Sequence, residues 1–258
     1  MSDKSALAAE MKAHEWAHRT FIRPQSWAVV RIDGRAFHTW TRGLDKPFDM
    51  DLLAAMDATT VALCEEIQCS VVGYTQSDEI SIIFTDTHSV QADLWFGGNV
   101  QKIASIAASH ATYAFNAAWQ KTPGTPHQKP ATFDARVFTV PTLDVIRYLI
   151  WRLRDSQKNA VSMLAQAKFS HRQLHGKNTS DMMGMLGTSA RELAETMARC
   201  YSGAFVTRHA DPGSVTYIRR DTGQEITTDF VRRVWRPAPA SLDDIRSLIP
   251  TLIPLEAK

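Results

Sequence analysis

This 258-residue sequence has little cysteine, no long apolar run and a net charge of only +2. Its three cysteines, Cys64, Cys69 and Cys200, are an odd number without Cys-x-x-Cys spacing, so neither a disulfide framework nor a zinc site is indicated. No stretch approaches the roughly 18 to 20 consecutive apolar residues that span a bilayer, and residues 1–4 lack the basic-then-apolar plan of a secretory signal. We therefore expect a soluble, cytoplasmic protein.

The common glycine-rich and nucleophile motifs are also absent. There is no Walker-type phosphate loop and no nucleophile elbow, so any phosphate chemistry would depend on metals and basic residues. The small net charge does not by itself indicate a nucleic-acid-binding protein. Arginines nevertheless cluster late in the chain, where a solvated face and an RNA-contacting face are both compatible with the pattern: Arg219, Arg220, Arg232, Arg233 and Arg236.

The order of the predicted elements in the first half is that of a split βαβ unit. Apolar periodicity predicts helices at about 3–19, 49–67 and 93–119 and strands at about 27–33, 70–74, 79–84 and 133–140. A loop rich in Pro, Thr and Gly is expected at 121–130. This order favours an α+β fold in which an antiparallel sheet with helices on one face forms a palm-like platform.

The second half reads differently. A long helix is predicted at 142–169, one or two short helices at 178–198, and β-hairpins at 203–236, where Asp-Pro-Gly and Asp-Thr-Gly are turn signals. We expect the tail after Pro237 to be loosely held. The expected division is a palm catalytic domain at 1–141 and a C-terminal part at 142–258 packed on it, which could also form one continuous domain with the palm.

Three acids stand at the ends of predicted strands. Asp33 follows one β-branched run, and Asp78 and Glu79 lie at the tip of the predicted 70–84 hairpin. Strand-end carboxylates are suitable ligands for Mg²⁺, and two such ions about 4 Å apart could clamp the oxygens of a phosphoryl transfer. Gly34 would let the backbone approach a metal or phosphate closely. Asp and Gly are also favoured in ordinary turns, so this pattern alone leaves a metal site and simple turn chemistry equally open.

Five short motifs together carry a family resemblance. They are Arg31-Ile32-Asp33-Gly34-Arg35-Ala36-Phe37-His38, Lys46-Pro47-Phe48-Asp49, Gln76-Ser77-Asp78-Glu79, Phe133-Asp134-Ala135-Arg136-Val137, and Trp151-Arg152 with Asp155 and Asn159. In this order and at these intervals they resemble the tRNA(His) guanylyltransferase family with its Thg1-like proteins, which are polymerases that add nucleotides in the 3′-to-5′ direction. The likeness covers about residues 5–236.

The resemblance implies a polymerase-like palm, two magnesium ions, ATP or GTP as activating and incoming nucleotides, the 5′ end of tRNA as substrate, and a homotetramer. By matching motifs, Asp33 and Asp78 would bridge the metals, the Gly34 carbonyl would complete a ligand set, and Glu79 would support Asp78. Positions implied in nucleotide binding are Arg31, Arg35, Ala36, Phe37, His38, Asp45, Lys46, Asp49, Ser77 and Lys102. Positions implied in contacts with tRNA or a second nucleotide are Arg136, Arg152, Asp155, Lys158 and Asn159.

Several of these positions also have a plain structural interpretation. Lys46 could be a solvated loop lysine, Lys102 an exposed helix lysine, and Asp49 the N-cap of a helix. His171 and His175 have the spacing of a metal-binding pair, but no glutamate or third ligand accompanies them in the sequence.

One departure from the family pattern bears on the reaction. Where eukaryotic members carry His-Ile-Asn-Asn-Leu-Tyr-Asn, this sequence has Gln157-Lys158-Asn159-Ala160-Val161-Ser162-Met163, which is more like the bacterial, archaeal and phage Thg1-like proteins. That likeness favours template-dependent tRNA repair over untemplated addition of guanosine. Two alternatives are a nucleotide cyclase or cyclic-dinucleotide synthase, for which the Gly-Gly-Asp-Glu-Phe run is missing, and a non-catalytic RNA-binding palm protein, against which the retained acids argue.

Overall fold

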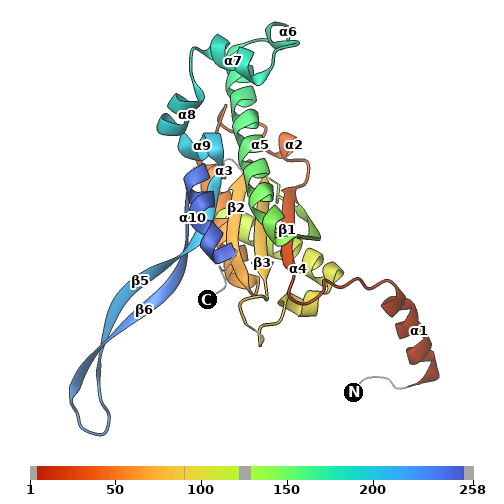
Figure 1. Cartoon of the computed structure of the whole chain (residues 1–258), viewed down its shortest axis with the longest axis vertical. Coiled ribbons are helices and arrows are strands. Elements are labelled where there is room, and N and C mark those ends of the chain that lie inside the picture. Colours follow the sequence, from red (N-terminus) through yellow and green to blue (C-terminus); the bar gives the residue numbers. More distant parts are fainter. Residues whose placement is uncertain (1–4, 90, 122–128, 253–258) are drawn as a thin grey trace.

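The computed structural model describes residues 5–89, 91–121 and 129–252, and its centre is one six-stranded antiparallel sheet (Figure 1). The strand order is β4-β1-β3-β2-β5-β6. The strands are β1 Trp27–Gly34, β2 Ser70–Gln76, β3 Glu79–Thr85, β4 Phe133–Val140, β5 Ala204–Ile218 and β6 Glu225–Pro239. Residues 3–4, most of the predicted 121–130 loop and residues 253–258 of the tail lie outside the described residues.

Helices surround this sheet and extend the molecule beyond it (Figure 1). Those before β4 are α1 Ala6–Ala17, α2 Phe37–Trp40, α3 Met50–Glu66, the 3₁₀ helix η1 Trp95–Gly98 and α4 Val100–Lys121. Those after β4 are α5 Thr142–Lys168, α6 His171–Leu174, α7 Thr179–Leu186, α8 Ala190–Thr196, α9 Ala198–Ser202 and α10 Leu242–Leu252. No helix in the described part of the chain is long and apolar enough to cross a membrane.

The central strand β1 is covered on both faces. Val30 and Ile32 pack into a core with the helices α3 and α4, whereas Trp27 and Val29 pack into a second core with α5 and α10. Because successive side chains of a strand point to opposite faces, a strand covered on both faces needs a continuous apolar run, which explains Trp27-Ala28-Val29-Val30. The predicted α+β fold is confirmed: α3 and α4 cover one face, and the C-terminal part covers the other.

The predicted helix at 93–119 begins later than expected. The short 3₁₀ helix η1 comes first, between the cap residues Leu94 and Asn99, and in it Phe96, Gly97 and Gly98 have positive φ values of 52°, 59° and 74°. A Cβ on Gly98 would lie 2.7 Å from the Ile22 carbonyl oxygen, so only glycine fits there. The glycine pair therefore sets the start of α4 at Val100.

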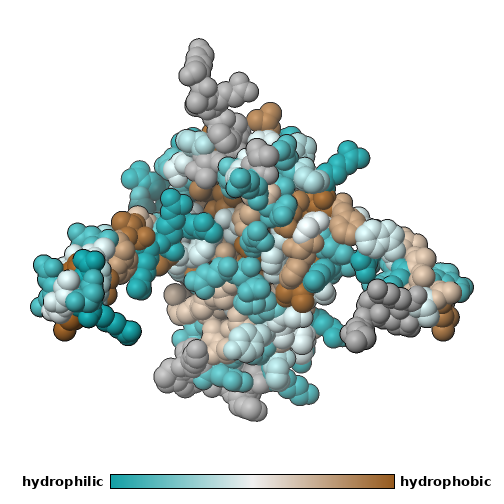
Figure 2. All heavy atoms as spheres, turned by 90° about the horizontal axis from the view of Figure 1, so that it is seen from below, coloured by the Kyte–Doolittle hydropathy of each residue, from teal (hydrophilic) through white to brown (hydrophobic). Residues whose placement is uncertain are grey.

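The C-terminal strands form one long hairpin rather than several. The Asp-Pro-Gly signal at 211–213 lies inside β5, so its prediction as a turn was wrong, and only the 219–224 segment reverses the chain. Proline is tolerated because a two-stranded ribbon leaves an unpaired edge, and a Cβ on Gly213 would lie 2.8 Å from the Phe230 ring. The outer part of the hairpin projects from the body on the side opposite α1 (Figures 1 and 2).

The expectation of a loosely held tail after Pro237 was also wrong for residues 238–252, the part of the tail that the structure describes. Strand β6 continues to Pro239, Ala240 is 4% exposed, and Ile245 of α10 is 1% exposed in the core shared with α5. The apolar side chains Ile245 and Leu248 are three apart, which is the spacing of a buried helix face. The described part of the tail therefore closes the second face of the sheet.

Candidate functional site

The two acidic strand ends meet at one rim of the sheet. In the register of β1 and β3, Asp33 lies opposite Glu79, and the Gly34 N–H donates to the Asp78 carbonyl at 3.0 Å. Residues directly opposite in antiparallel strands share a face, so the pairing produces rows across the sheet. The outermost row is Asp134, Asp33, Glu79 and Gln76, and the next is Arg136, Arg31, Ser81 and Tyr74. A row of polar side chains, three of them carboxylates, therefore lies above a row with two arginines.

Asp78 occupies the turn between β2 and β3. The Ser77 backbone has a positive φ of 49°, and its hydroxyl donates to Asp78 Oδ1 at 3.0 Å. Burial raises the pKa of the Asp78 carboxyl, and the charge of Asp33 raises it further, against the lowering effect of the Ser77 hydrogen bond. A cation at this position would relieve the repulsion between the two carboxylates.

Glu79 is held by the buried residue Arg152 of α5. The Arg152 guanidinium donates to Glu79 Oε2 at 2.8 Å and to Asp155 Oδ2 at 3.1 Å, and Arg31 Nε lies 3.8 Å from the same glutamate oxygen. Burial still raises the pKa of the Glu79 carboxyl despite both arginines, because removing a charge from water outweighs these attractions. The Glu79 carboxylate therefore pairs with Arg152 and Arg31 on the inner side of the rim.

The donor set at the rim fits magnesium. Within the described residues no three His, Cys, Asp or Glu side chains are arranged to hold a metal by themselves. Magnesium commonly takes only one or two carboxylates and completes its shell with water and substrate phosphates. The Asp33 and Asp78 carboxylates, with the neighbouring Gly34 backbone, are a set of that kind.

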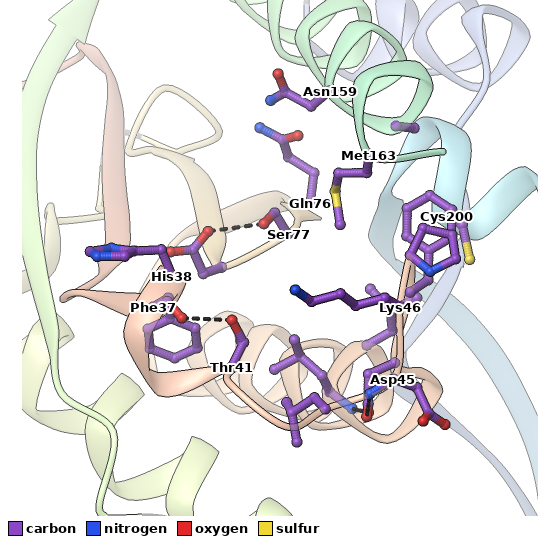
Figure 3. Close-up of a pocket in the computed structure, with 18 of the residues that line it drawn as sticks. Phe37, His38, Thr41, Asp45, Lys46, Gln76, Ser77, Asn159, Met163 and Cys200 are labelled. Atoms are coloured by element: carbon purple, nitrogen blue, oxygen red, sulfur yellow. Dashed lines mark hydrogen bonds between the residues drawn. The ribbon is translucent and has the colours of Figure 1, made fainter. Parts of the chain in front are cut away.

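A cavity of about 630 Å³ opens directly beside this rim. Its walls come from the 34–53 segment, the β2–β3 turn, α5 and α9. Lys46 extends from its loop into the cavity toward Ser77, and Asn159 and Met163 point in from α5 (Figure 3). Because ligand pockets for molecules of nucleotide size occupy about 300 to 1,000 Å³, this cavity has the volume to hold one.

Most of the predicted site residues fall into two groups. Those that line the cavity are Gly34, Ala36, Phe37, His38, Asp45, Lys46, Asp49, Ser77, Asp78 and Asn159. Asp33, Glu79, Arg31, Arg136, Arg152 and Asp155 lie in the polar rows or next to them. Asp49 is the N-cap of α3, since its carboxylate accepts from Leu52 N at 2.8 Å and also from Asp45 N at 3.1 Å.

Three predicted residues belong to neither group. Lys102 lies near the start of α4, where its ammonium sits 4.5 Å from the Phe96 ring centroid. The rim is reached by the other end of that helix, because Asn116 donates to the Ala131 carbonyl at 2.8 Å, and 14 residues of helix span about 21 Å. Arg35 and Lys158 are exposed and also do not line the cavity.

The far wall of the cavity was not predicted. Arg199 of α9 makes hydrogen bonds of 2.7, 3.0 and 3.2 Å with Asp57 of α3, and this pair holds α9, with Cys200, against the cavity. The two residues are 142 positions apart, so no local pattern in the sequence signals the pair. The exposed pair His171 and His175 has ring centroids 6.4 Å apart and no third ligand among the described residues.

A sheet with acids at one rim and a nucleotide-sized cavity beside it is the architecture of the palm-type nucleotidyltransferases. The sequence model of the tRNAHis guanylyltransferase family (Thg1) matches residues 8–141. A bacterial Thg1-like protein solved with ATP is 33% identical, with a TM-score of 0.80 over 96% of this chain and 99% of that one. A bacterial Thg1-like structure with GTP is 30% identical, with a TM-score of 0.78 over 97% and 100%.

Curated guanylyltransferases show the same relationship over a shorter stretch. The probable tRNA(His) guanylyltransferase of Dictyostelium discoideum is 35% identical over 137 residues, which are 52% of each chain. The aligned part of this chain thus spans about half the length of that relative. The protein belongs to the tRNAHis guanylyltransferase family, which confirms the resemblance found in the motifs.

Proposed function

We propose that this protein is a magnesium-dependent enzyme that adds nucleotides in the 3′-to-5′ direction to the 5′ end of tRNA. The proposal rests on the place where the cavity meets the rim: Gly34, Ser77 and Asp78 line the cavity, and the Gly34 N–H donates to the Asp78 carbonyl at the ends of the strands. A nucleoside triphosphate whose base lies in the cavity can reach the acids with its phosphates. ATP or GTP is the proposed occupant, since bacterial relatives were solved with each of them.

The residues around this junction suit phosphoryl transfer. Lys46 extends into the cavity toward Ser77, where its ammonium would neutralise phosphate charge and the Ser77 hydroxyl would be a further donor (Figure 3). His38 also lines the cavity. Asp33, Asp78 and the Gly34 carbonyl would hold the metal. Two bound magnesium ions would neutralise the transferring phosphate and lower the pKa of the attacking hydroxyl.

In the proposed reaction the 3′-hydroxyl of an incoming nucleotide attacks the activated 5′ phosphate of the tRNA. The new phosphodiester bond forms as the bond to the activating nucleotide monophosphate, or to pyrophosphate when the RNA carries a 5′-triphosphate, breaks. The role of Arg152 is to fix Glu79, and through it the turn that carries Asp78. Arg136 is exposed, with its guanidinium 3.8 Å from Asp33, and is available to the second nucleotide or to the tRNA.

We further propose that addition follows a template. The segment Gln157–Met163 departs from the eukaryotic motif, and Asn159, Ala160 and Met163 from this segment line the cavity.

A homotetramer in the cytoplasm is part of the same proposal. It is supported by α1, which buries none of its residues and exposes Leu7 by 66% and Trp16 by 61%, as a segment that packs on another subunit would. Mass measurement in solution tests the tetramer.

The decisive experiment offers the purified protein a 5′-truncated tRNA, Mg²⁺ and each labelled nucleoside triphosphate in turn. We expect extension by the nucleotide complementary to the opposite strand. Extension by guanosine on every template would reject templated repair, and no extension on any tRNA would reject the polymerase function.

The metal-binding role has its own test in the same assay. Asp33→Ala and Asp78→Ala should each lower extension at least about a hundredfold, because each removes a charge that acts on the transition state. Their far-UV circular dichroism should match that of the parent protein. Extension at the parent rate by either variant would exclude that residue as a metal ligand.

A further inference from the structure

A stretch of 25 residues beside the cavity carries charge of only one sign. From Ser156 to Ser180 the sequence has no Asp or Glu, although acids make up 27 of the 258 residues overall. The cations of this stretch, which we call the basic ridge, are Lys158, Lys168, Arg172 and Lys177. All four side chains are exposed, and none makes an ion pair with a described residue.

The basic ridge adjoins the cavity and leads away from it. Asn159 and Ala167 line the cavity, and each is next in sequence to a ridge lysine. The ridge continues through α6 to the tip of the molecule above α5 (Figure 1). The helix α5 reaches the acidic rim at Arg152, and the 16 residues from there to Lys168 rise about 24 Å. The ridge therefore spans the distance between the rim and the tip.

Unpaired cations in a row are unusual on a protein surface that has acids available elsewhere. Exposed charges of one sign repel one another, and pairing them with a neighbouring Asp or Glu would be favourable. An extended array of Lys and Arg without acids matches the spaced negative charges of a nucleic-acid backbone. The ligand that fits this surface is therefore a nucleic-acid backbone, with its chain of phosphodiester groups.

The late arginines of the β5–β6 hairpin are less suited to this role. Arg236 is paired with Asp211 at 2.7 Å and Arg219 with Asp221 at 3.0 Å. Arg232 stacks over Phe230 with its guanidinium carbon 4.7 Å from the ring centroid. Much of the positive charge of the hairpin is thus already engaged, whereas that of the ridge is free.

We infer that the basic ridge binds the phosphate backbone of the RNA substrate and positions its body while its 5′ end lies at the acidic rim. This inference rests on the proposed function, because it takes the RNA end to be at Asp33 and Asp78. The ridge adds no reacting group. It would set affinity and its dependence on salt, while the cavity independently sets the affinity for the nucleotide.

The test compares two triple variants of equal net charge. Lys168→Gln/Arg172→Gln/Lys177→Gln removes three ridge cations, and Lys12→Gln/Arg147→Gln/Arg246→Gln removes three exposed cations from α1, the start of α5 and α10. Binding of a transcribed, 5′-truncated tRNA(His) is measured between 50 and 200 mM salt, and binding of ATP is measured in parallel.

We expect the ridge variant to bind the transcript at least about tenfold more weakly at physiological salt, with a salt slope smaller by about 2 to 3, and to bind ATP like the parent. The control variant should bind both ligands like the parent. Equal losses in both variants would mean that only overall charge matters, and an unchanged ridge variant would mean that the RNA lies elsewhere; either result overturns the inference. If the parent protein itself binds and extends no tRNA, the proposed function fails instead.

Discussion

Among single residues, Arg152 connects the helix α5 to the acidic rim. Its side chain is 4% exposed and its guanidinium joins Glu79 and Asp155. A buried ion pair contributes little net stability, yet removing one partner leaves the other charge buried without compensation. The contribution of Arg152 to the free energy of unfolding can therefore be measured by removing Arg152 alone and then together with the charge of Glu79.

Arg152→Met should lower the free energy of unfolding by about 3 to 5 kcal/mol, because Glu79 would remain buried and charged beside the weaker partner Arg31. Urea unfolding at neutral pH measures this loss. The double variant Arg152→Met/Glu79→Gln should recover at least about half of it, since no isolated carboxylate remains. If the double variant is as unstable as the single one, the effect is one of packing.

Buried tyrosines should make the protein sensitive to alkali. Burial raises the pKa of Tyr148, whose hydroxyl lies 2.7 Å from Ser81 Oγ, to about 12, and burial raises the pKa of Tyr74 as well. In the unfolded chain tyrosine ionises near pH 10, so stability is fully present below that pH and is lost as the pH rises from about 10 to 12.

The expected loss from Tyr148 is about 1.4 kcal/mol per pH unit in that window. Urea midpoints at pH 8, 10 and 11 measure it, and Tyr148→Phe should lose less between pH 10 and 11 than the parent does. Equal losses in the two proteins would show that Tyr148 does not titrate on unfolding.

Among the elements, α9 forms a wall of the cavity and is attached to α3 by one ion pair. The side chains of Arg199 and Asp57 are 14% and 20% exposed, and three hydrogen bonds join them. The helix has only five residues, so its own hydrogen bonds cannot keep it folded or fixed in place. The Arg199–Asp57 pair therefore helps to fix this end of the cavity, together with the buried Tyr201 side chain and the hydrogen bond that the Tyr74 hydroxyl donates to the Ser202 carbonyl at 2.8 Å.

Arg199→Met should lower the free energy of unfolding by about 1 to 3 kcal/mol, because a half-buried carboxylate loses its partner. It should also weaken ATP binding, which titration calorimetry measures. Arg191→Met is the matched control: its pair with Glu195 is exposed, and its loss should cost less than about 0.5 kcal/mol and leave ATP binding unchanged. Unchanged ATP affinity in Arg199→Met would show that the Arg199–Asp57 pair does not shape the nucleotide site.

In the whole molecule, the two halves of the chain share one sheet and both of its cores. Strand β5 pairs with β2, and α5 and α10 cover the face of β1 and β3 that contains Val29 and Ile83. A fragment ending at Val140 or Pro141 would expose this entire face and leave β2 as an open edge. We propose that the palm and the C-terminal part are one cooperative unit.

Residues 5–252 should therefore unfold in one urea transition that is the same by fluorescence and by circular dichroism. The fragment 5–141 should be aggregated or unfolded under the same conditions. A soluble fragment with a cooperative transition of its own would show instead that the palm folds independently.

Local sequence determined a large part of this structure. The strands β1, β2, β3 and β4 follow from apolar runs of β-branched residues, and α3 and α5 from helical periodicity, so their predicted bounds agree with the structure to within a few residues. The acids at 33, 78 and 79 were found because each interrupts or ends such a run. These features depend on residues that are close together in the sequence, so the local pattern is enough to predict them.

Only the tertiary structure decided what depends on distant segments. It set the pairing of Asp33 with Glu79, the Arg152–Glu79 and Arg199–Asp57 contacts, the distance of Lys102 from the rim, and the packing of Ile245 of α10 against α5. It also turned the Asp-Pro-Gly signal into part of a strand, because pairing along β6 outweighed the local preference for a turn. The sequence shows that a carboxylate lies at the end of a strand, because the strand pattern is local. Which arginine pairs with that carboxylate depends on how the sheet and the helices pack, because the two residues are far apart in the sequence.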